Sequence, residues 1–97
     1  MSRAATYILC YDVTLDAERD RVAKIAEGHG LRIQYSVFEC RLGRSALAAL
    51  CRQLEDLKLT SGGVAILCLD DRAHRHMIGS PHTAEPLAGH SSHSLMV

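Results

Sequence analysis

The stretch Tyr7-Ile8-Leu9-Cys10-Tyr11-Asp12-Val13-Thr14 is apolar and aromatic until it reaches a carboxylate. A run of β-branched and aromatic residues predicts a strand that is buried on at least one face. An acid at the end of such a strand serves as a turn residue, a helix cap or a metal ligand. These residues alone leave open whether Asp12 is a solvated turn acid or a ligand.

Two stretches further along have apolar residues at helical spacing, which predicts two amphipathic helices. The first begins at Asp16, which can cap it, and ends near the glycines on either side of His29. The second runs from Arg44 to Lys58, with Ser45 near its start. Its apolar face consists of Leu47, Leu50, Cys51, Leu54 and Leu57.

Three other stretches predict strands. Residues 31–42 alternate in polarity and predict one long strand of about ten residues. The run from Val64 to Leu69 is continuously apolar, which suits a strand covered on both faces, and residues 74–79 predict a weaker strand before Pro81. The predicted order is strand, helix, long strand, helix, strand, strand. It fits, in spirit, an α+β protein, a ferredoxin-like βαββαβ sandwich with both helices on one face of an antiparallel sheet.

The predicted organisation is a core domain at residues 1–80 and a C-terminal extension at residues 81–97. Two helices cover only one face of a sheet, so the other face is available to a second copy of the chain. The last four residues, 94–97, include three apolar side chains after a polar stretch. They predict a terminal strand that crosses to the other protomer of a homodimer.

Composition narrows the class of protein. The chain has 97 residues, and its 11 basic and 11 acidic residues cancel, so any nucleic-acid surface has to be local. The cysteines lie in apolar segments without metal-ligand spacing, which predicts core positions in a reducing compartment. No signal peptide or membrane span is indicated, so we expect a soluble cytoplasmic protein. The four cysteines are Cys10, Cys40, Cys51 and Cys68.

The arginines and aromatic residues offer a local surface for nucleic acid. Guanidinium groups match phosphate geometry, although charges on helices are more often simply solvated. Aromatic rings near the first strand can stack on bases or belong to the core. The candidates are Arg19, Arg21, Arg32, Arg41, Tyr11 and Phe38.

A single carboxylate holds Mg²⁺ poorly without substrate phosphate. A two-fold dimer, however, brings two copies of Asp12 toward one axis and builds a two-carboxylate site. A divalent ion held there would activate water or stabilise a leaving oxygen in phosphodiester hydrolysis.

Three motifs carry a family resemblance: residues 7–14, then Arg19-Asp20-Arg21-Val22-Ala23-Lys24, then Gly30 to Cys40 with its Gln-Tyr-Ser-Val-Phe-Glu run. Over about residues 5 to 69 the chain resembles the small CRISPR-associated adaptation protein family, the second and smaller subunit in spacer acquisition. The third predicted strand lacks the basic and aromatic residues frequent in relatives, and residues 81–93 show no pattern that aligns.

The resemblance implies a ferredoxin-like homodimer with an exchanged C-terminal strand. It implies a Mg²⁺-dependent endonuclease that hydrolyses phosphodiester bonds in RNA or duplex DNA. The alternative is a non-catalytic scaffold that binds duplex prespacer DNA for an integrase subunit. By the same resemblance Asp12 is the catalytic residue and Mg²⁺ ligand, and the nucleic-acid-binding residues are Tyr11, Arg19, Arg21, Arg32 and Phe38.

Overall fold

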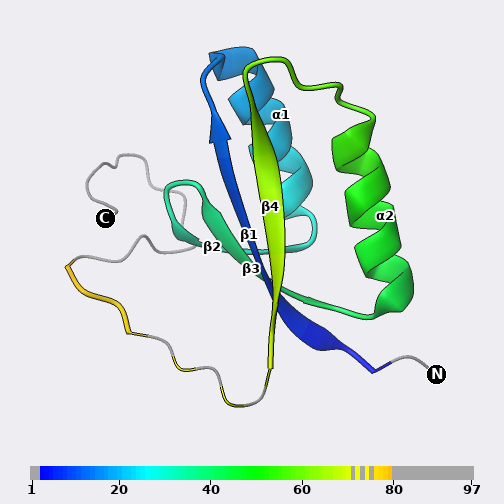
Figure 1. Ribbon diagram of the computed structural model, residues 1–97, viewed down its shortest axis with the longest axis vertical. Helices are drawn as coiled ribbons and strands as arrows, with labels where there is room; N and C mark the ends of the chain where they lie inside the picture. Colours follow the sequence, from blue (N-terminus) through cyan, green and yellow to red (C-terminus); the bar gives the residue numbers. More distant parts are fainter. Residues whose placement is uncertain (1–2, 71, 73, 75, 80–97) are drawn as a thin grey trace.

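The structure is a computed structural model that describes residues 3–70, 72, 74 and 76–79. Its elements follow the order βαββαβ (Figure 1). They are β1 (Ala5–Val13), α1 (Asp16–Glu27), β2 (Gly30–Gln34), β3 (Val37–Leu42), α2 (Arg44–Glu55) and β4 (Gly62–Leu69).

The four strands form one sheet in the order β2-β3-β1-β4, and every neighbouring pair is antiparallel. Both helices pack on the same face of this sheet (Figure 1). This arrangement confirms the predicted ferredoxin-like α+β fold. It also makes β1 a central strand, with β3 on one side and β4 on the other.

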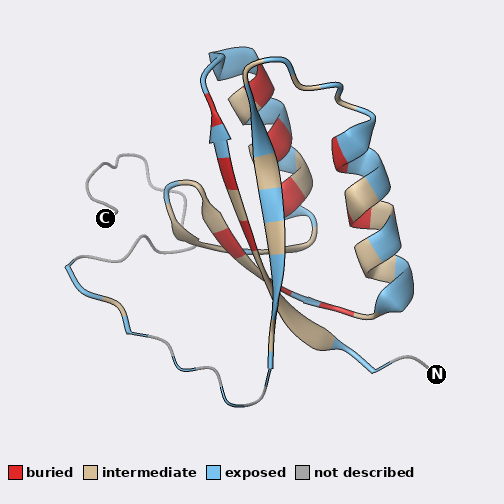
Figure 2. Ribbon diagram, in the orientation of Figure 1, coloured by how far each residue is buried: buried red, intermediate tan, exposed pale blue. Residues whose placement is uncertain are grey.

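Residues of β1 alternate between the two faces, as a pleated strand requires. Leu9, Tyr11 and Val13 point toward the helices and are buried, whereas Asp12 between them is exposed. Figure 2 shows the buried positions on β1, β3 and the inner sides of the helices, while β4 has none. The core consists of Leu9, Tyr11, Val13, Val22, Ala26, Phe38, Cys40, Leu42, Leu50 and Leu54.

The single long strand predicted for residues 31–42 is wrong, because the chain turns back at Tyr35 and Ser36 to form the β2–β3 hairpin. The turn contains none of the Asn-Gly or Gly-Gly pairs that mark two-residue hairpins, and polarity keeps alternating through it. Ser36 still belongs to the sheet's hydrogen bonding, since its carbonyl accepts a bond of 3.1 Å from the Tyr11 amide.

The predicted strand at residues 74–79 is also wrong, since its described residues, 74 and 76–79, lie in no strand. The fourth strand of the fold is β4, and the hairpin supplies the extra strand that the prediction lacked. β4 is not covered on both faces in this protomer. Leu67 on its open face is 55% exposed, because both helices lie on the other side.

The helix ends differ slightly from expectation. α1 is capped at Leu15 and α2 at Gly43, and neither has a side-chain capping hydrogen bond, so Asp16 and Ser45 do not cap. α2 ends at Glu55, one turn before Lys58. Lys58 has a positive φ of 54°, a backbone conformation that ends a helix.

The cysteines are all free, but only Cys40 is buried, and Cys68 is exposed, so the prediction of four core cysteines is wrong. Neither helix in the described part of the chain is long and apolar enough to cross a bilayer. Residues 81–97 lie outside the described residues, so the division at residue 80 and the exchanged strand stay predictions.

Candidate functional site

Asp12 is exposed at the end of β1, on the sheet face that no helix covers. Its nearest partner across the β1–β4 ladder is Gly63, which offers no side chain. Within the described residues, no group of three or more His, Cys, Asp or Glu side chains is arranged to hold a metal ion. Asp12 thus belongs to no such cluster in the described part of the chain.

The backbone beside Asp12 is held by an unusually close approach of β4. Gly62 has a φ of +154°, and a Cβ atom on it would lie 1.8 Å from the Asp12 carbonyl oxygen. Only glycine fits such a position without moving the neighbouring strand. A Cβ on Gly63, by contrast, would meet nothing within 4 Å. Gly62 thus lets β4 run tightly against the end of β1.

Arg19, in the first turn of α1, bonds to the turn that follows Asp12. Its Nη1 donates hydrogen bonds to the carbonyl oxygens of Val13 at 3.2 Å and Thr14 at 3.1 Å, and its Nη2 pairs with Asp16. These bonds satisfy carbonyls that the end of β1 would otherwise leave to water. The guanidinium therefore fixes the β1–α1 turn, and its freedom to contact a phosphate is correspondingly smaller.

Tyr11, Phe38 and Arg32 come together on the helix side of the sheet. The Tyr11 and Phe38 rings stack with centroids 6.4 Å apart, and the Arg32 Cζ lies 5.0 Å from the Phe38 centroid. Phe38 is fully buried and Tyr11 nearly so, which raises the pKa of the Tyr11 hydroxyl. Tyr11 therefore packs on Phe38, Phe38 lies against Arg32, and neither ring offers an open surface to a base in this chain.

Arg32 has spare hydrogen-bonding capacity. Its Nε is buried without a hydrogen-bond partner among the described residues, and its Nη2 is 3.9 Å from the Glu27 carboxylate. Its Cζ also lies 5.8 Å from the ring centroid of Tyr35, which is 55% exposed. The side chain is 21% exposed and its Nε is buried, so a phosphate would have to bind at the terminal nitrogens of this planar guanidinium.

The structure brings Tyr11, Phe38 and Arg32 together and separates them from Asp12, which projects from the opposite face. Arg21 is exposed on α1. Arg41, on the open face, donates a hydrogen bond of 3.1 Å to the Thr6 hydroxyl. The candidate residues thus form two groups, one on each side of the sheet, and do not make one site within a protomer.

Sequence reasoning missed Glu18, the one buried charged residue in the described part of the chain. Its carboxylate accepts five hydrogen bonds of 2.7 to 3.2 Å from the backbone amides and hydroxyls of Thr60 and Ser61. The hydroxyl of Ser61, then that of Thr60, lower the pKa of Glu18 to about 2. The available signal was its spacing, because Glu18 is four residues before Val22 on the buried face of α1.

An apolar area occupies the open sheet face next to Asp12. Strand register places Leu31, Glu39, Ile8 and Leu67 in one row across all four strands. Leu31 is 63% exposed and Leu67 55%. We call this area the open face; its apolar members are Ile8, Cys10, Leu31, Val37, Ala65, Leu67 and Leu69.

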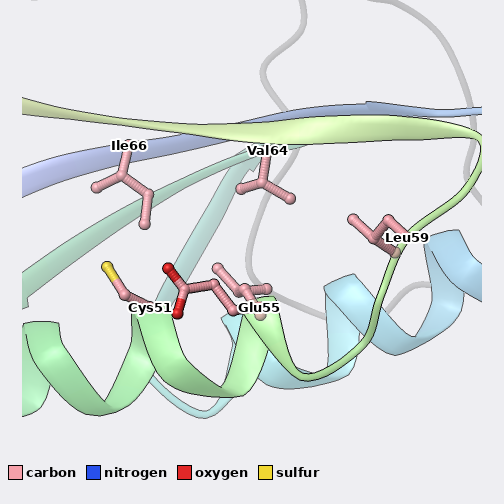
Figure 3. A pocket seen from close by; sticks show the side chains of 6 residues that line it. Cys51, Glu55, Leu59, Val64 and Ile66 are labelled. Atoms are coloured by element: carbon pink, nitrogen blue, oxygen red, sulfur yellow. The ribbon is translucent and has the colours of Figure 1, made fainter.

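A groove of about 280 Å³ lies on the other side of the sheet, between α2 and β4 (Figure 3). In Figure 3 the thiol of Cys51 and the carboxylate of Glu55 point from α2 toward Ile66 and Val64 on β4. The remaining lining residues are Leu54 and Leu59. None of the candidate site residues lines this groove.

These features define a small ferredoxin-like α+β protein with one exposed acid at the end of its first strand and an arginine–aromatic cluster on its helix side. The family model described as CRISPR associated protein Cas2 matches residues 5–77. The chain therefore belongs to the Cas2 family.

Individual relatives agree with this assignment. "CRISPR-associated endoribonuclease Cas2 2" of Synechocystis sp. is 37% identical over 84 residues, which cover 82% of this chain and 90% of the relative. "CRISPR-associated endoribonuclease Cas2 1" of Chloroflexus aurantiacus is 33% identical over 88 residues, covering 84% and 95%. A shorter match, 41% identical to "CRISPR-associated endoribonuclease Cas2 3" of Synechocystis sp., spans 53% of this chain and 55% of the relative.

Solved structures share the fold. A hypothetical protein from Thermus thermophilus superposes with a TM-score of 0.75 and 27% identity, covering 86% of this chain and all (100%) of that one. A second structure, described as that of cas2, has a TM-score of 0.72 and 24% identity, with coverage of 89% and 97%. This second likeness supports the fold alone.

Proposed function

We propose that this chain acts in CRISPR adaptation as a homodimeric, divalent-metal-dependent endonuclease that hydrolyses phosphodiester bonds, with RNA as the first substrate to test. The observation that carries the proposal is the position of Asp12. It is an exposed carboxylate, in no cluster of three possible metal ligands among the described residues, at the edge of a sheet face that a second protomer would cover. The relatives' printed names, which describe endoribonucleases, support the choice of RNA.

The dimer follows from the open face. The open face exposes large apolar side chains on either side of Glu39, which are costly to leave in water, and a two-fold dimer is the commonest way to cover such a face. Leu31 and Leu67 are the large apolar side chains exposed on this face. Packing two open faces about an axis near the end of β1 would bring two Asp12 carboxylates close together.

The residues fit a hard divalent cation only in that dimer. Mg²⁺ is often held by one or two carboxylates together with water and substrate phosphate, and the described residues of one chain gather no cluster of three possible ligands around Asp12. We therefore assign Mg²⁺, or another divalent cation, to the pair of Asp12 side chains. When bound there, the cation would activate water and offset negative charge on the scissile phosphate.

The chain's own residues would bind and orient the nucleic acid. Arg32, whose guanidinium lies over the Phe38 ring and whose side chain is 21% exposed, would contact a backbone phosphate through its terminal nitrogens. Arg21 would add a second contact from the exposed surface of α1. Arg19 would keep the turn after Asp12 in place, while Tyr11 and Phe38 act through Arg32 by supporting its guanidinium.

The exchanged strand has a place to bind in this fold. β4 is an edge strand of the described sheet, so its outer backbone groups are available to another strand. We propose that residues 94–97 of one protomer pair with β4 of the other. Free cysteines throughout agree with the cytoplasm as the compartment where this dimer works.

A second candidate function is a non-catalytic scaffold that binds duplex prespacer DNA for a partner integrase. The separation of the arginine–aromatic cluster from Asp12 favours it. Arginines on the opposite side of the sheet from Asp12 can bind a duplex, but they are poorly placed to direct a scissile phosphate to that acid. Both functions can reside in one dimer.

The test compares wild-type protein with Asp12→Asn and with Asp56→Asn, a charge-matched control at the exposed end of α2. We expect Asp12→Asn to slow Mg²⁺-dependent RNA cleavage by about 100-fold. Dimerisation and nucleic-acid binding should be retained, and Asp56→Asn should cleave as wild type. Cleavage by Asp12→Asn at the wild-type rate would refute the nuclease proposal, and unchanged duplex DNA binding would then favour the scaffold.

A further inference from the structure

We propose that Glu18 is a positioning residue for Asp12, acting through Ser61 on the turn that follows the strand-end acid. The inference rests on the proposed nuclease function, since its main consequence is a change in the rate of cleavage. Glu18 lies on the buried face of α1 and touches neither Asp12 nor the open face.

The path from Glu18 to the turn consists of short hydrogen bonds. The Ser61 hydroxyl donates to Glu18 Oε1 at 2.7 Å and accepts a bond of 3.0 Å from the Leu15 amide. The Ser61 carbonyl accepts both from the Thr14 amide at 3.0 Å and from the Thr14 hydroxyl at 2.9 Å. Ser61 thus ties Glu18 to the residues that follow Asp12.

The charge on Glu18 sets the direction of these bonds. An ionised carboxylate is an acceptor only, so the single hydroxyl hydrogen of Ser61 has to point at Glu18. The hydroxyl lone pairs are then free to accept from the Leu15 amide. A side chain that donates a hydrogen bond to the Ser61 hydroxyl from this position would compete with the Leu15 amide for the hydroxyl oxygen and weaken the bond to the turn.

The other side of Asp12 is held by the residues that follow Ser61. Gly62 and Gly63 pair with Val13 and Asp12 in the β1–β4 ladder. The Asp12 carbonyl oxygen lies close against the Gly62 backbone, because a Cβ atom placed on Gly62 would lie 1.8 Å from it. Fixing Ser61 therefore fixes Asp12 from β4 as well as from the β1–α1 turn.

This network is more than a surface contact. The carboxylate of Glu18 takes hydrogen bonds from both backbone amides and both hydroxyls of Thr60 and Ser61, a full set of donors for a partly desolvated acid. Because all donors come from the loop that leads into β4, the loop has one position relative to α1. Small displacements of a reacting group reduce rates strongly, so such fixation matters for Asp12.

The experiment uses full-length dimer and three variants: Glu18→Gln, Ser61→Ala and Glu55→Gln, the last an exposed acid on α2 as control. We expect Glu18→Gln to lower kcat for RNA cleavage about tenfold with KM unchanged, because binding residues are untouched. Ser61→Ala should act similarly, and combining both should cost little more than either, since they share one path. Glu55→Gln should match wild type.

Amide hydrogen exchange separates this inference from the proposed function and from simple loss of folding. In Glu18→Gln the Thr14 and Leu15 amides should exchange at least about tenfold faster, while amides in the middle of α2 keep wild-type protection. If wild type proves not to cleave RNA, amide exchange at Thr14 and Leu15 alone decides whether Glu18 holds the turn after Asp12. Unchanged exchange at Thr14 and Leu15, or unchanged kcat in a cleaving protein, would overturn the positioning role.

Discussion

Tyr11 and Asp12 are adjacent in β1 and project from opposite faces of the sheet, one into the core and the other into solvent. This relationship divides the candidate residues into two groups. Tyr11 stacks on Phe38 and belongs with Arg32, whereas Asp12 belongs with the apolar open face. The protein's two proposed tasks, holding nucleic acid and placing a metal, thus use different surfaces of each protomer.

The open face should carry the dimer. We expect Leu67→Glu to convert the dimer into monomers, because two desolvated carboxylates would face an apolar surface. Sedimentation velocity measures this directly. Leu15→Glu is the matched control, since Leu15 is 53% exposed but lies in the β1–α1 turn, and it should stay dimeric. If the Leu67→Glu protein remains dimeric, the dimer interface does not lie on the open face.

Arg32 should contribute to nucleic-acid affinity as a planar group. We predict that Arg32→Lys weakens RNA binding about tenfold, because an ammonium cannot reproduce the stacked, multidentate guanidinium. The dependence of binding on salt should change little, since the charge is kept. Fluorescence anisotropy over a salt series measures both. Arg52→Lys on α2 is the control, and equal affinities for the two variants would exclude Arg32 from the interface.

Gly62 and Gly63 give a matched pair for the packing beside Asp12. Gly62→Ala should lower the free energy of unfolding by about 2 kcal/mol or more, because of positive φ and a backbone clash. Gly63→Ala meets nothing within 4 Å and should be close to wild type. Urea unfolding measures both. Similar stabilities would mean that β4 does not press against the Asp12 carbonyl.

Glu18 makes stability depend on acid pH. Hydrogen bonds lower its pKa from 4.5 to about 2, so the folded state binds this proton less readily than the unfolded state. Its contribution is therefore complete above pH 4.5 and is lost as the pH falls toward 2. The stability gap between wild type and Glu18→Gln should shrink over that interval. A gap that stays constant with pH would contradict the ionised Glu18.

The sequence predicts β1 and α2 well because their apolar residues follow the strand and helix periods closely. It fails at Tyr35 and Ser36, where alternation continues through a turn without glycine. The sequence also predicts four strands, but it places one at residues 74–79, whereas the structure divides residues 31–42 between β2 and β3. The periodic signal thus reported which residues alternate, but not where the chain reverses.

The site shows a similar division. The position of Asp12 near the end of a strand was predictable from the Tyr-Asp pair. The structure shows its side chain exposed there, as either a turn acid or a metal ligand would be. The burial of Phe38 depends on the register between β1 and β3, which a single sequence does not contain. Glu18 was missed because it stands in a charged helix segment, and its partners Thr60 and Ser61 are more than forty residues away in sequence, at separations of 42 and 43.

The central claim is that the catalytic site belongs to two Asp12 side chains. Wild type and Asp12→Asn, unfolded and refolded together in equal amounts, form dimers of all three compositions. If both acids are needed, only wild-type homodimers cleave. At the same total protein concentration, the RNA cleavage rate of the mixture should then be about one quarter of that of wild type alone. A rate of about one half would mean that each Asp12 acts alone and would contradict the shared site.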